Sequence, residues 1–112
     1  MRRKTMENYP ALTESTFYVL MALYEKDTFG TEIVEYINNV SNNRVPMGPG
    51  TLYTILSKFE TDGLIKETAV EGRKRTYTIT DRGREVFTQE IKRLNEVLKT
   101  AQEAKGRYHE TN

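Results

Sequence analysis

The sequence GPGTLYTILSKFETDGLI, residues 48–65, marks both ends of a single helix. Pro49 suits the first helical position, where a missing N–H costs nothing, and Gly63 suits a left-handed cap at the C-terminal end. Between these residues the apolar side chains are spaced i, i+3, i+4 and i+7 and would form one buried stripe: Leu52, Ile55, Leu56 and Phe59. We therefore predict a helix whose two ends are both fixed by the local sequence.

The opposite face of this helix would be small and polar. At about 100° per residue, the residues that point away from the buried stripe are Gly50, Tyr53, Thr54, Ser57, Lys58 and Thr61. Small hydroxyl side chains allow a close approach to a DNA major groove, and the N–H groups of Gly50 and Thr51 would face a phosphate. A helix face that is only solvated explains the same residues equally well.

Two helices are predicted before this stretch, and two strands and a long helix after it. A first helix would begin after Thr13, a suitable N-terminal cap, and a second would run through Ile33 to Val40. Residues 64–68 and 76–79 have the composition of short strands, and Thr80 would cap a last helix that reaches Gly106 or beyond. This order predicts an α+β fold, mainly α with a small β-hairpin, of the winged helix-turn-helix type.

Basic residues cluster in the predicted turn between the two strands. The chain carries 17 basic and 16 acidic residues, a net charge of +1, so no global basic field indicates a nucleic-acid partner. Residues 66–84 nevertheless contain six basic and three acidic side chains. Arg73, Lys74 and Arg75 would repel one another at a hairpin tip unless an anion lay between them. A charge run is usually a solvated loop, but its place beside the polar helix favours a wing that binds phosphates.

These features resemble the PadR family of transcriptional regulators. The resemblance covers residues 12–88 and is carried, in this order, by FGTEI (29–33), GPGTLY (48–53), FETDGLI (59–65), GRKRTY (72–77) and TDRG (80–83). It implies a dimeric repressor whose third helix reads DNA, whose wing contacts the DNA backbone, and whose Thr51 and Tyr53 touch phosphates. The chain departs from the family pattern at Gly48, where a serine cap is usual, and at Thr31, where a tyrosine is frequent.

The helix, the wing and the resemblance together give one set of predicted DNA-binding residues. The set is Gly50, Thr51, Tyr53, Thr54, Ser57, Lys58, Arg73, Lys74 and Arg75. We expect an N-terminal arm at residues 1–11, a winged helix-turn-helix DNA-binding domain at 12–80, and a dimerisation helix with a polar tail at 81–112. The predicted function is that of a sequence-specific repressor that binds double-stranded operator DNA.

The last helix carries an apolar seam that predicts a homodimer. The seam residues are spaced 4, 3, 4, 3, 4, 3, as in a coiled-coil heptad: Phe87, Ile91, Leu94, Leu98, Ala101, Lys105 and Tyr108. The first helix is apolar over much of its circumference, so we expect Phe17 and Leu20 to join the interface. A twofold axis would set the two reading helices about one DNA turn, roughly 34 Å, apart, and the operator should be an inverted repeat.

The composition argues against several other classes of protein. With no cysteine, one histidine, no glycine-rich phosphate loop and no metal-ligand spacing, we expect neither an enzyme nor a bound metal or cofactor. The longest apolar run, residues 17–24, is too short to span a bilayer, and we expect a cytoplasmic protein. A winged helix used only for protein–protein contact is the alternative, although it leaves the basic turn unexplained.

The resemblance also implies a small aromatic or drug-like effector. The aromatic residues that could line its site are Tyr9, Phe17, Tyr18, Tyr24 and Tyr108. Packing in the core or at the interface explains any one of them more readily.

Overall fold

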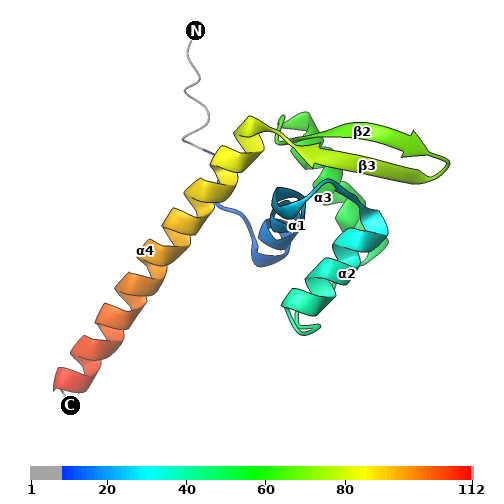
Figure 1. Ribbon diagram of the computed structural model, residues 1–112. Coiled ribbons are helices and arrows are strands. Elements are labelled where there is room, and N and C mark those ends of the chain that lie inside the picture. The colour runs from blue at the N-terminus through cyan, green and yellow to red at the C-terminus, as the bar shows by residue number, and fades with distance from the viewer. Residues whose placement is uncertain (1–8, 112) are drawn as a thin grey trace, which may run out of the picture.

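The computed structural model describes residues 9–111. Its elements along the chain are α1 (Glu14–Glu25), β1 (Thr28–Phe29), α2 (Gly30–Val40), α3 (Pro49–Thr61), β2 (Ile65–Glu71), β3 (Lys74–Ile79) and α4 (Asp81–Thr111). Figure 1 shows the β2–β3 hairpin and α4 pointing in opposite directions from the three packed helices. The predicted α+β winged helix-turn-helix fold is confirmed. The predicted N-terminal arm lies mostly outside the described residues.

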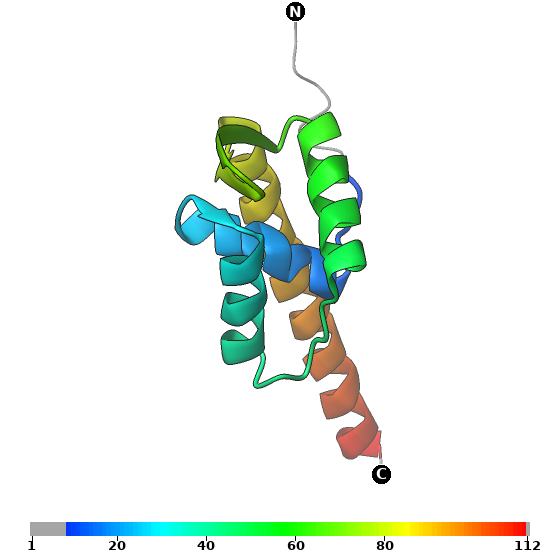
Figure 2. The ribbon, with the colours of Figure 1, turned by 90° about the vertical axis from the view of Figure 1, so that its right-hand side faces the viewer.

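The core lies between α1, α2, α3 and the base of the hairpin. Figure 2 shows α1 crossing between α2 and α3, and α1 also contacts β3 and α4. The fully buried side chains include those of Val19, Leu20, Ile33, Ile37 and Leu64. The predicted stripe of α3 is buried at Leu52, Leu56 and Phe59, while Ile55 is only partly covered. Because α1 contacts four other elements, most of its broad apolar surface is covered within its own chain, while Tyr24 stays 43% exposed.

The sheet has three strands in the order β1-β3-β2, which corrects the predicted two-stranded ribbon. The extra strand pairs Thr28 with Tyr77 and Phe29 with Thr76 in an antiparallel register. Thr28 is buried, and its hydroxyl donates a 2.7 Å hydrogen bond to Glu32. A strand of two residues is too short to show a periodic pattern, so no local signal indicated it.

The hairpin is longer than predicted and its turn is tighter. The strands pair as far as Glu71 and Lys74, and Gly72 adopts the positive φ of +63° that the turn requires. Lys74 and Arg75 therefore belong to β3, and only Arg73 of the three consecutive bases lies in the turn. The prediction that all three share the hairpin tip is wrong, because pairing continues to the residues directly beside the turn.

Both ends of α3 are formed as the sequence indicates. Gly48 provides no side-chain hydrogen bond to the first turn, and Pro49 begins the helix. At the other end Gly63 has a φ of +78°, and its N–H donates to Glu60 O at 3.1 Å. The Leu64 N–H donates to Phe59 O at 2.9 Å, which completes a Schellman cap. The position of α3 is thus fixed at its C-terminal end by backbone hydrogen bonds.

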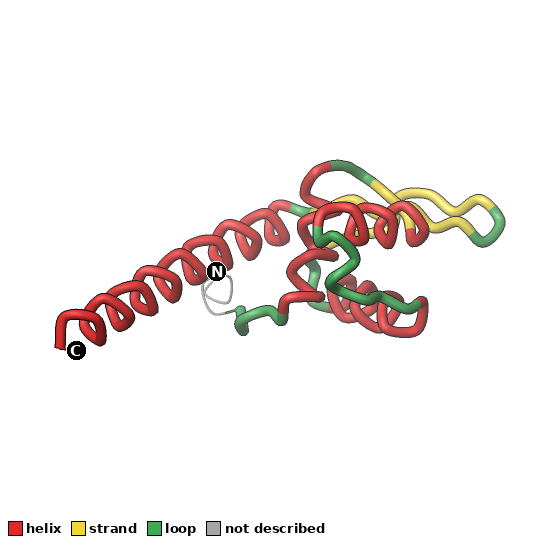
Figure 3. Tube along the Cα trace, turned by 90° about the horizontal axis from the view of Figure 1, so that it is seen from below, coloured by secondary structure: helices red, strands yellow, loops and turns green. Residues whose placement is uncertain are grey.

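The long helix α4 begins at the predicted cap and extends beyond the core. Thr80 Oγ1 accepts a 3.1 Å hydrogen bond from the Gly83 N–H, as an N-terminal cap does. Every residue from Leu94 to Tyr108 is exposed, and Figure 3 shows this part of α4 projecting away from the remaining elements. Within residues 9–111, no helix combines the length and the apolar composition needed to cross a membrane.

Candidate nucleic-acid interface

The outward face of α3 is exposed as predicted. Its exposed residues include Gly50, Thr51, Tyr53, Thr54, Ser57 and Lys58. The Thr54 hydroxyl donates a 3.0 Å hydrogen bond to Gly50 O, so its donor is satisfied within the helix. The N-terminal cap offers no side chain to the first-turn N–H groups. A helix start of this kind leaves backbone donors and the positive end of the dipole for an anion.

Tyr53 reaches from α3 to the start of α2. A Cβ placed on Gly30 would lie 2.9 Å from the Tyr53 hydroxyl oxygen, so the ring is close to the first residue of α2. The N-cap of α2, Phe29, makes no side-chain capping hydrogen bond. The Tyr53 hydroxyl consequently lies beside a second helix N-terminus while 48% of the residue stays exposed. Gly30 belongs to the FGTEI motif but was not among the predicted DNA-binding residues, because its approach to Tyr53 depends on the packing of α2 against α3.

Lys58 is held by an acidic partner on its own helix. Its ammonium lies 2.9 Å from Asp62 Oδ2, and the Tyr9 hydroxyl donates a 2.6 Å hydrogen bond to the same oxygen. Both contacts lower the pKa of Asp62, and the hydrogen bond from Tyr9 has the larger effect. Burial and the same hydrogen bond raise the pKa of Tyr9. The Lys58 side chain remains 68% exposed, so its ammonium is reachable from solvent although Asp62 partly neutralises it.

The three bases of the wing lie in three different surroundings. Arg73 is exposed in the turn. The Lys74 ammonium lies 4.3 Å above the centre of the Phe29 ring, a cation–π contact that joins β3 to β1. Arg75 Nη1 lies 3.4 Å from Glu67 Oε2 on the neighbouring strand. Neither Phe29 nor Glu67 was predicted to contact a wing base. The repulsion expected among the bases is relieved partly by these two side chains.

The predicted dimer seam divides into buried and exposed residues. Leu20 is fully buried, so it cannot offer surface to a partner, and the prediction that places it at the interface is wrong. Phe87 is only 8% exposed and stacks on Phe17 at 5.2 Å and on Tyr24 at 4.3 Å, so it too belongs mainly to its own chain. The seam residues that remain exposed are Ile91, Leu94, Leu98, Ala101, Lys105 and Tyr108.

A groove of about 490 Å³ lies between α1 and α4 at the start of the exposed seam. Its apolar lining is Leu12, Phe17, Tyr18, Met21 and Leu94. Glu90 is buried beside it and forms a two-point ion pair with Arg93, with 3.1 Å between Arg93 Nε and Glu90 Oε1. Of the five aromatic residues predicted for an effector site, only Phe17 and Tyr18 line this groove. Within the described residues, no group of three His, Asp or Glu side chains could hold a metal ion.

Comparison with known proteins agrees with this geometry. The model of the transcriptional regulator PadR-like family matches residues 19–89, which is more than half of the chain. The chain belongs to this family. This family is one of transcriptional regulators.

Solved structures of transcriptional regulators share the fold. A transcriptional regulator from Clostridium thermocellum matches with a TM-score of 0.70 at 27% identity, over 79% of this chain and 89% of the other. Bacillus subtilis PadR in complex with operator DNA matches with a TM-score of 0.62 at 20% identity, over 70% of this chain and 48% of the other. The second likeness is one of fold alone.

One relative in sequence is a much longer protein. A 37.1 kDa protein in transposon TN4556 of Streptomyces fradiae is 34% identical over 77 residues, 69% of this chain. The present chain spans 22% of that relative's length.

Proposed function

We propose that this PadR-family protein is a sequence-specific repressor that binds double-stranded operator DNA through α3 and the β2–β3 wing. The observation that supports this most directly is the exposed face of α3, whose side chains are mostly small and polar. The opposite side of α3 packs against β2, so the helix and the wing lie next to each other. A helix of this kind can enter a major groove while the wing follows the adjacent phosphates. The B. subtilis PadR neighbour, which was solved with operator DNA, has the same fold.

Each part of the proposed interface has its own task. The uncapped N–H groups of Gly50 and Thr51 and the Tyr53 hydroxyl would bind phosphates, and these contacts would fix the register. Thr54, Ser57 and Lys58 would meet base edges. The wing residues Arg73, Lys74 and Arg75 would bind the DNA backbone with little regard to sequence. Because Arg73 alone of the three lies in the turn at the end of the hairpin, we assign it the largest share of the wing contact.

We further propose that the functional unit is a homodimer. The exposed part of α4 carries Ile91, Leu94, Val97 and Leu98, which are each at least 40% exposed in one chain. A second copy of the chain would cover them around a twofold axis and present two copies of α3 to an inverted repeat. The groove between α1 and α4 would then lie at the edge of the dimer interface. It is the proposed site for a small aromatic effector that changes DNA affinity.

Fluorescence anisotropy with labelled duplexes from the DNA upstream of the gene tests the DNA-binding role. Replacing Arg73, Lys74 and Arg75 together by alanine should weaken binding to all sequences and reduce the salt slope by up to about 3 units, roughly one for each phosphate that is no longer bound. The matched control replaces Arg84, Lys92 and Lys99 of α4 by alanine and should change neither quantity beyond the general charge effect. Unchanged affinity in the wing variant would contradict the assignment. A protein–protein module would show neither tight duplex binding nor the steep salt dependence that phosphate contacts give.

A further inference from the structure

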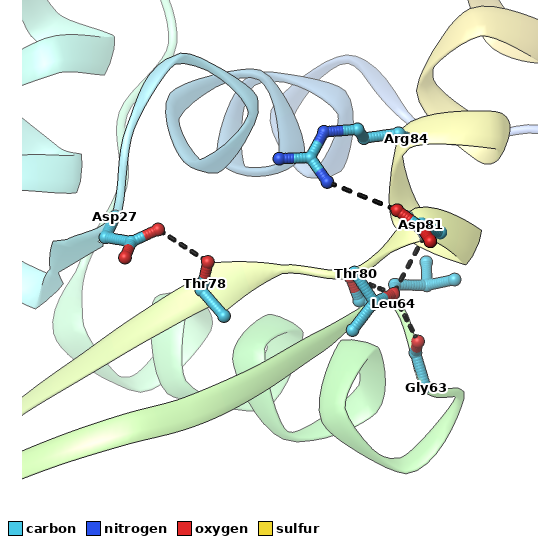
Figure 4. A network of polar contacts seen from close by, with 8 residues as sticks. Asp27, Gly63, Leu64, Thr78, Thr80, Asp81 and Arg84 are labelled. Atoms are coloured by element: carbon cyan, nitrogen blue, oxygen red, sulfur yellow. Dashed lines mark hydrogen bonds and ion pairs between the residues drawn. The ribbon is translucent and has the colours of Figure 1, made fainter.

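One threonine joins the end of the DNA-reading helix to the start of the dimer helix. Thr80 Oγ1 lies 2.7 Å from Gly63 O and 3.0 Å from Leu64 O, so it donates its proton to this pair of carbonyls (Figure 4). The same oxygen accepts the Gly83 N–H, and the Thr80 N–H donates to Leu64 O at 2.9 Å. The carbonyls of residues 63 and 64 and the N-terminus of α4 therefore share one hydrogen-bond network.

Gly63 and Leu64 are also the capping residues of α3. Their N–H groups bind the last turn of α3, and their carbonyls bind Thr80. Two consecutive residues are thus hydrogen-bonded to α3 through their N–H groups and to the cap of α4 through their carbonyls. A change in the angle between the two helices would have to break one of these sets of hydrogen bonds.

The first turn of α4 is packed directly on the second of these residues, Leu64. A Cβ placed on Gly83 would lie 2.2 Å from Leu64 O and 2.6 Å from Ile79 Cγ1. No side chain fits there, so the glycine permits backbone of α4 to touch backbone at the start of β2. This contact and the Thr80 hydrogen bonds together form the α3–α4 junction, defined here as Gly63, Leu64, Thr80 and Gly83.

We propose that the α3–α4 junction determines the half-site spacing that this protein selects, with Thr80 as its positioning residue. The inference rests on the proposed function. If the dimer is held by α4 and DNA is read by α3, the separation of the two reading helices depends on the angle between α3 and α4 in each chain. Thr80 fixes that angle without touching DNA. It therefore confers spacing specificity, while base specificity stays with α3.

The chain supplies a matched control for Thr80. Thr78, two residues earlier on β3, donates a 2.5 Å hydrogen bond to Asp27 and takes no part in the junction (Figure 4). Thr80→Val removes the junction hydroxyl with almost no change of shape, Thr80→Ser restores it, and Thr78→Val removes a hydroxyl from the same strand elsewhere. A general loss of stability would affect the two valine variants alike.

The first measurement reads spacing preference on DNA. Inverted repeats are selected by the wild-type protein from a randomised duplex library, and affinities are then measured for the best repeat with its spacer lengthened or shortened by single base pairs. Thr80→Val should reduce the discrimination between spacers by about fivefold, the change in an equilibrium constant typical of removing a threonine N-cap. Thr80→Ser and Thr78→Val should keep the wild-type discrimination.

The second measurement needs neither DNA nor the dimer. Since the chain has no cysteine, Glu60→Cys on α3 and Glu96→Cys on α4 take two spin labels at defined exposed sites. The distance between them is read in labelled protein diluted with unlabelled chains. Thr80→Val should broaden or shift this distance distribution, and Thr80→Ser and Thr78→Val should not. Identical distributions in the wild type and Thr80→Val would overturn the proposal. Failure of the wild type to select any inverted repeat would instead overturn the proposed function, and the label distances would still decide whether Thr80 couples the helices.

Discussion

Arg75 and Glu67 form an ion pair between the two strands of the wing, with 3.4 Å between Arg75 Nη1 and Glu67 Oε2. The Glu67 oxygen is buried and has no hydrogen-bond partner among the described residues. The contact is therefore electrostatic without good hydrogen-bond geometry, and the 56% exposed Arg75 side chain can leave it for a phosphate. If the wing binds DNA as proposed, Glu67 would therefore compete with a phosphate for Arg75.

Glu67→Gln should increase affinity for duplex DNA of any sequence. The variant removes a negative charge and frees Arg75, so the slope of log affinity against log salt should steepen by up to about 1 unit. Anisotropy titrations at several salt concentrations measure both quantities. Glu71→Gln removes the same charge from the same strand without releasing Arg75 and serves as the control. Equal gains in the two variants would show that only net charge matters.

The structure makes a second prediction about the Tyr53 hydroxyl. Gly30→Ala would place a methyl group 2.9 Å from this oxygen, so the tyrosine must move. We expect Gly30→Ala and Tyr53→Phe each to weaken operator binding by about 1–2 kcal/mol, the value of one charge-assisted hydrogen bond. Because both changes remove the same contact, the double variant should lose little more than either single variant. Additive losses would mean that the two residues act independently.

The parts of this fold that could be predicted are those whose signals are local. The caps of α3 depend on Pro49 and Gly63 themselves, and the cap of α4 depends on Thr80, so each was visible in a few consecutive residues. The strand β1 was not predictable, because Thr28 and Phe29 become a strand only through pairing with residues 76 and 77. The partners of the wing bases were hidden for the same reason, since a register shift between Glu67 and Ala69 sets which side chains meet.

The dimer seam shows a different limit of sequence patterns. An apolar face predicts burial but does not identify the surface that buries it. Leu20 and Leu98 both fit an interface pattern, yet Leu20 is fully covered by its own chain and Leu98 is 55% exposed. The heptad spacing continues from Phe87, which is buried in the core, to Leu94 and Leu98 in the exposed part of α4. Only the position of α1 against α4 decides which seam residues are buried within the chain and which stay exposed.

The hydrogen bond from Tyr9 to Asp62 predicts a pH-dependent contribution to stability. The folded-state pKa of Asp62 is lowered from its ordinary value of 3.8, first by Tyr9 and then by Lys58. A depressed carboxyl pKa gives stability that is present above pH 3.8 and is lost as the pH falls through the lower folded-state value. Tyr9→Phe should therefore cost about 1 kcal/mol of unfolding free energy at pH 7, and this difference should shrink in acid.

Urea unfolding at neutral and acidic pH measures this difference. Tyr24→Phe is the control, because the Tyr24 ring stacks on Phe87 and no hydrogen bond from its hydroxyl is seen in the described part of the chain. Its effect should be small and should not vary with pH. A cost of Tyr9→Phe that is the same at both pH values would mean that the ionised form of Asp62 is not what Tyr9 stabilises.

The exposed seam of α4 makes the final prediction, which concerns assembly. Leu94 and Leu98 are 40% and 55% exposed in one chain, so aspartates there are tolerated by the isolated fold but would be buried without partners in a dimer. Light scattering at micromolar concentration should give twice the chain mass of 13.0 kDa for the wild type and one chain mass for the Leu94→Asp, Leu98→Asp variant. Circular dichroism should stay close to wild type. The variant should also lose tight operator binding, because each half-site alone binds weakly.

Lys92→Asp with Lys99→Asp introduces the same two acids outside the seam and should remain dimeric. A wild-type mass of one chain, or a dimeric seam variant, would contradict the proposed interface.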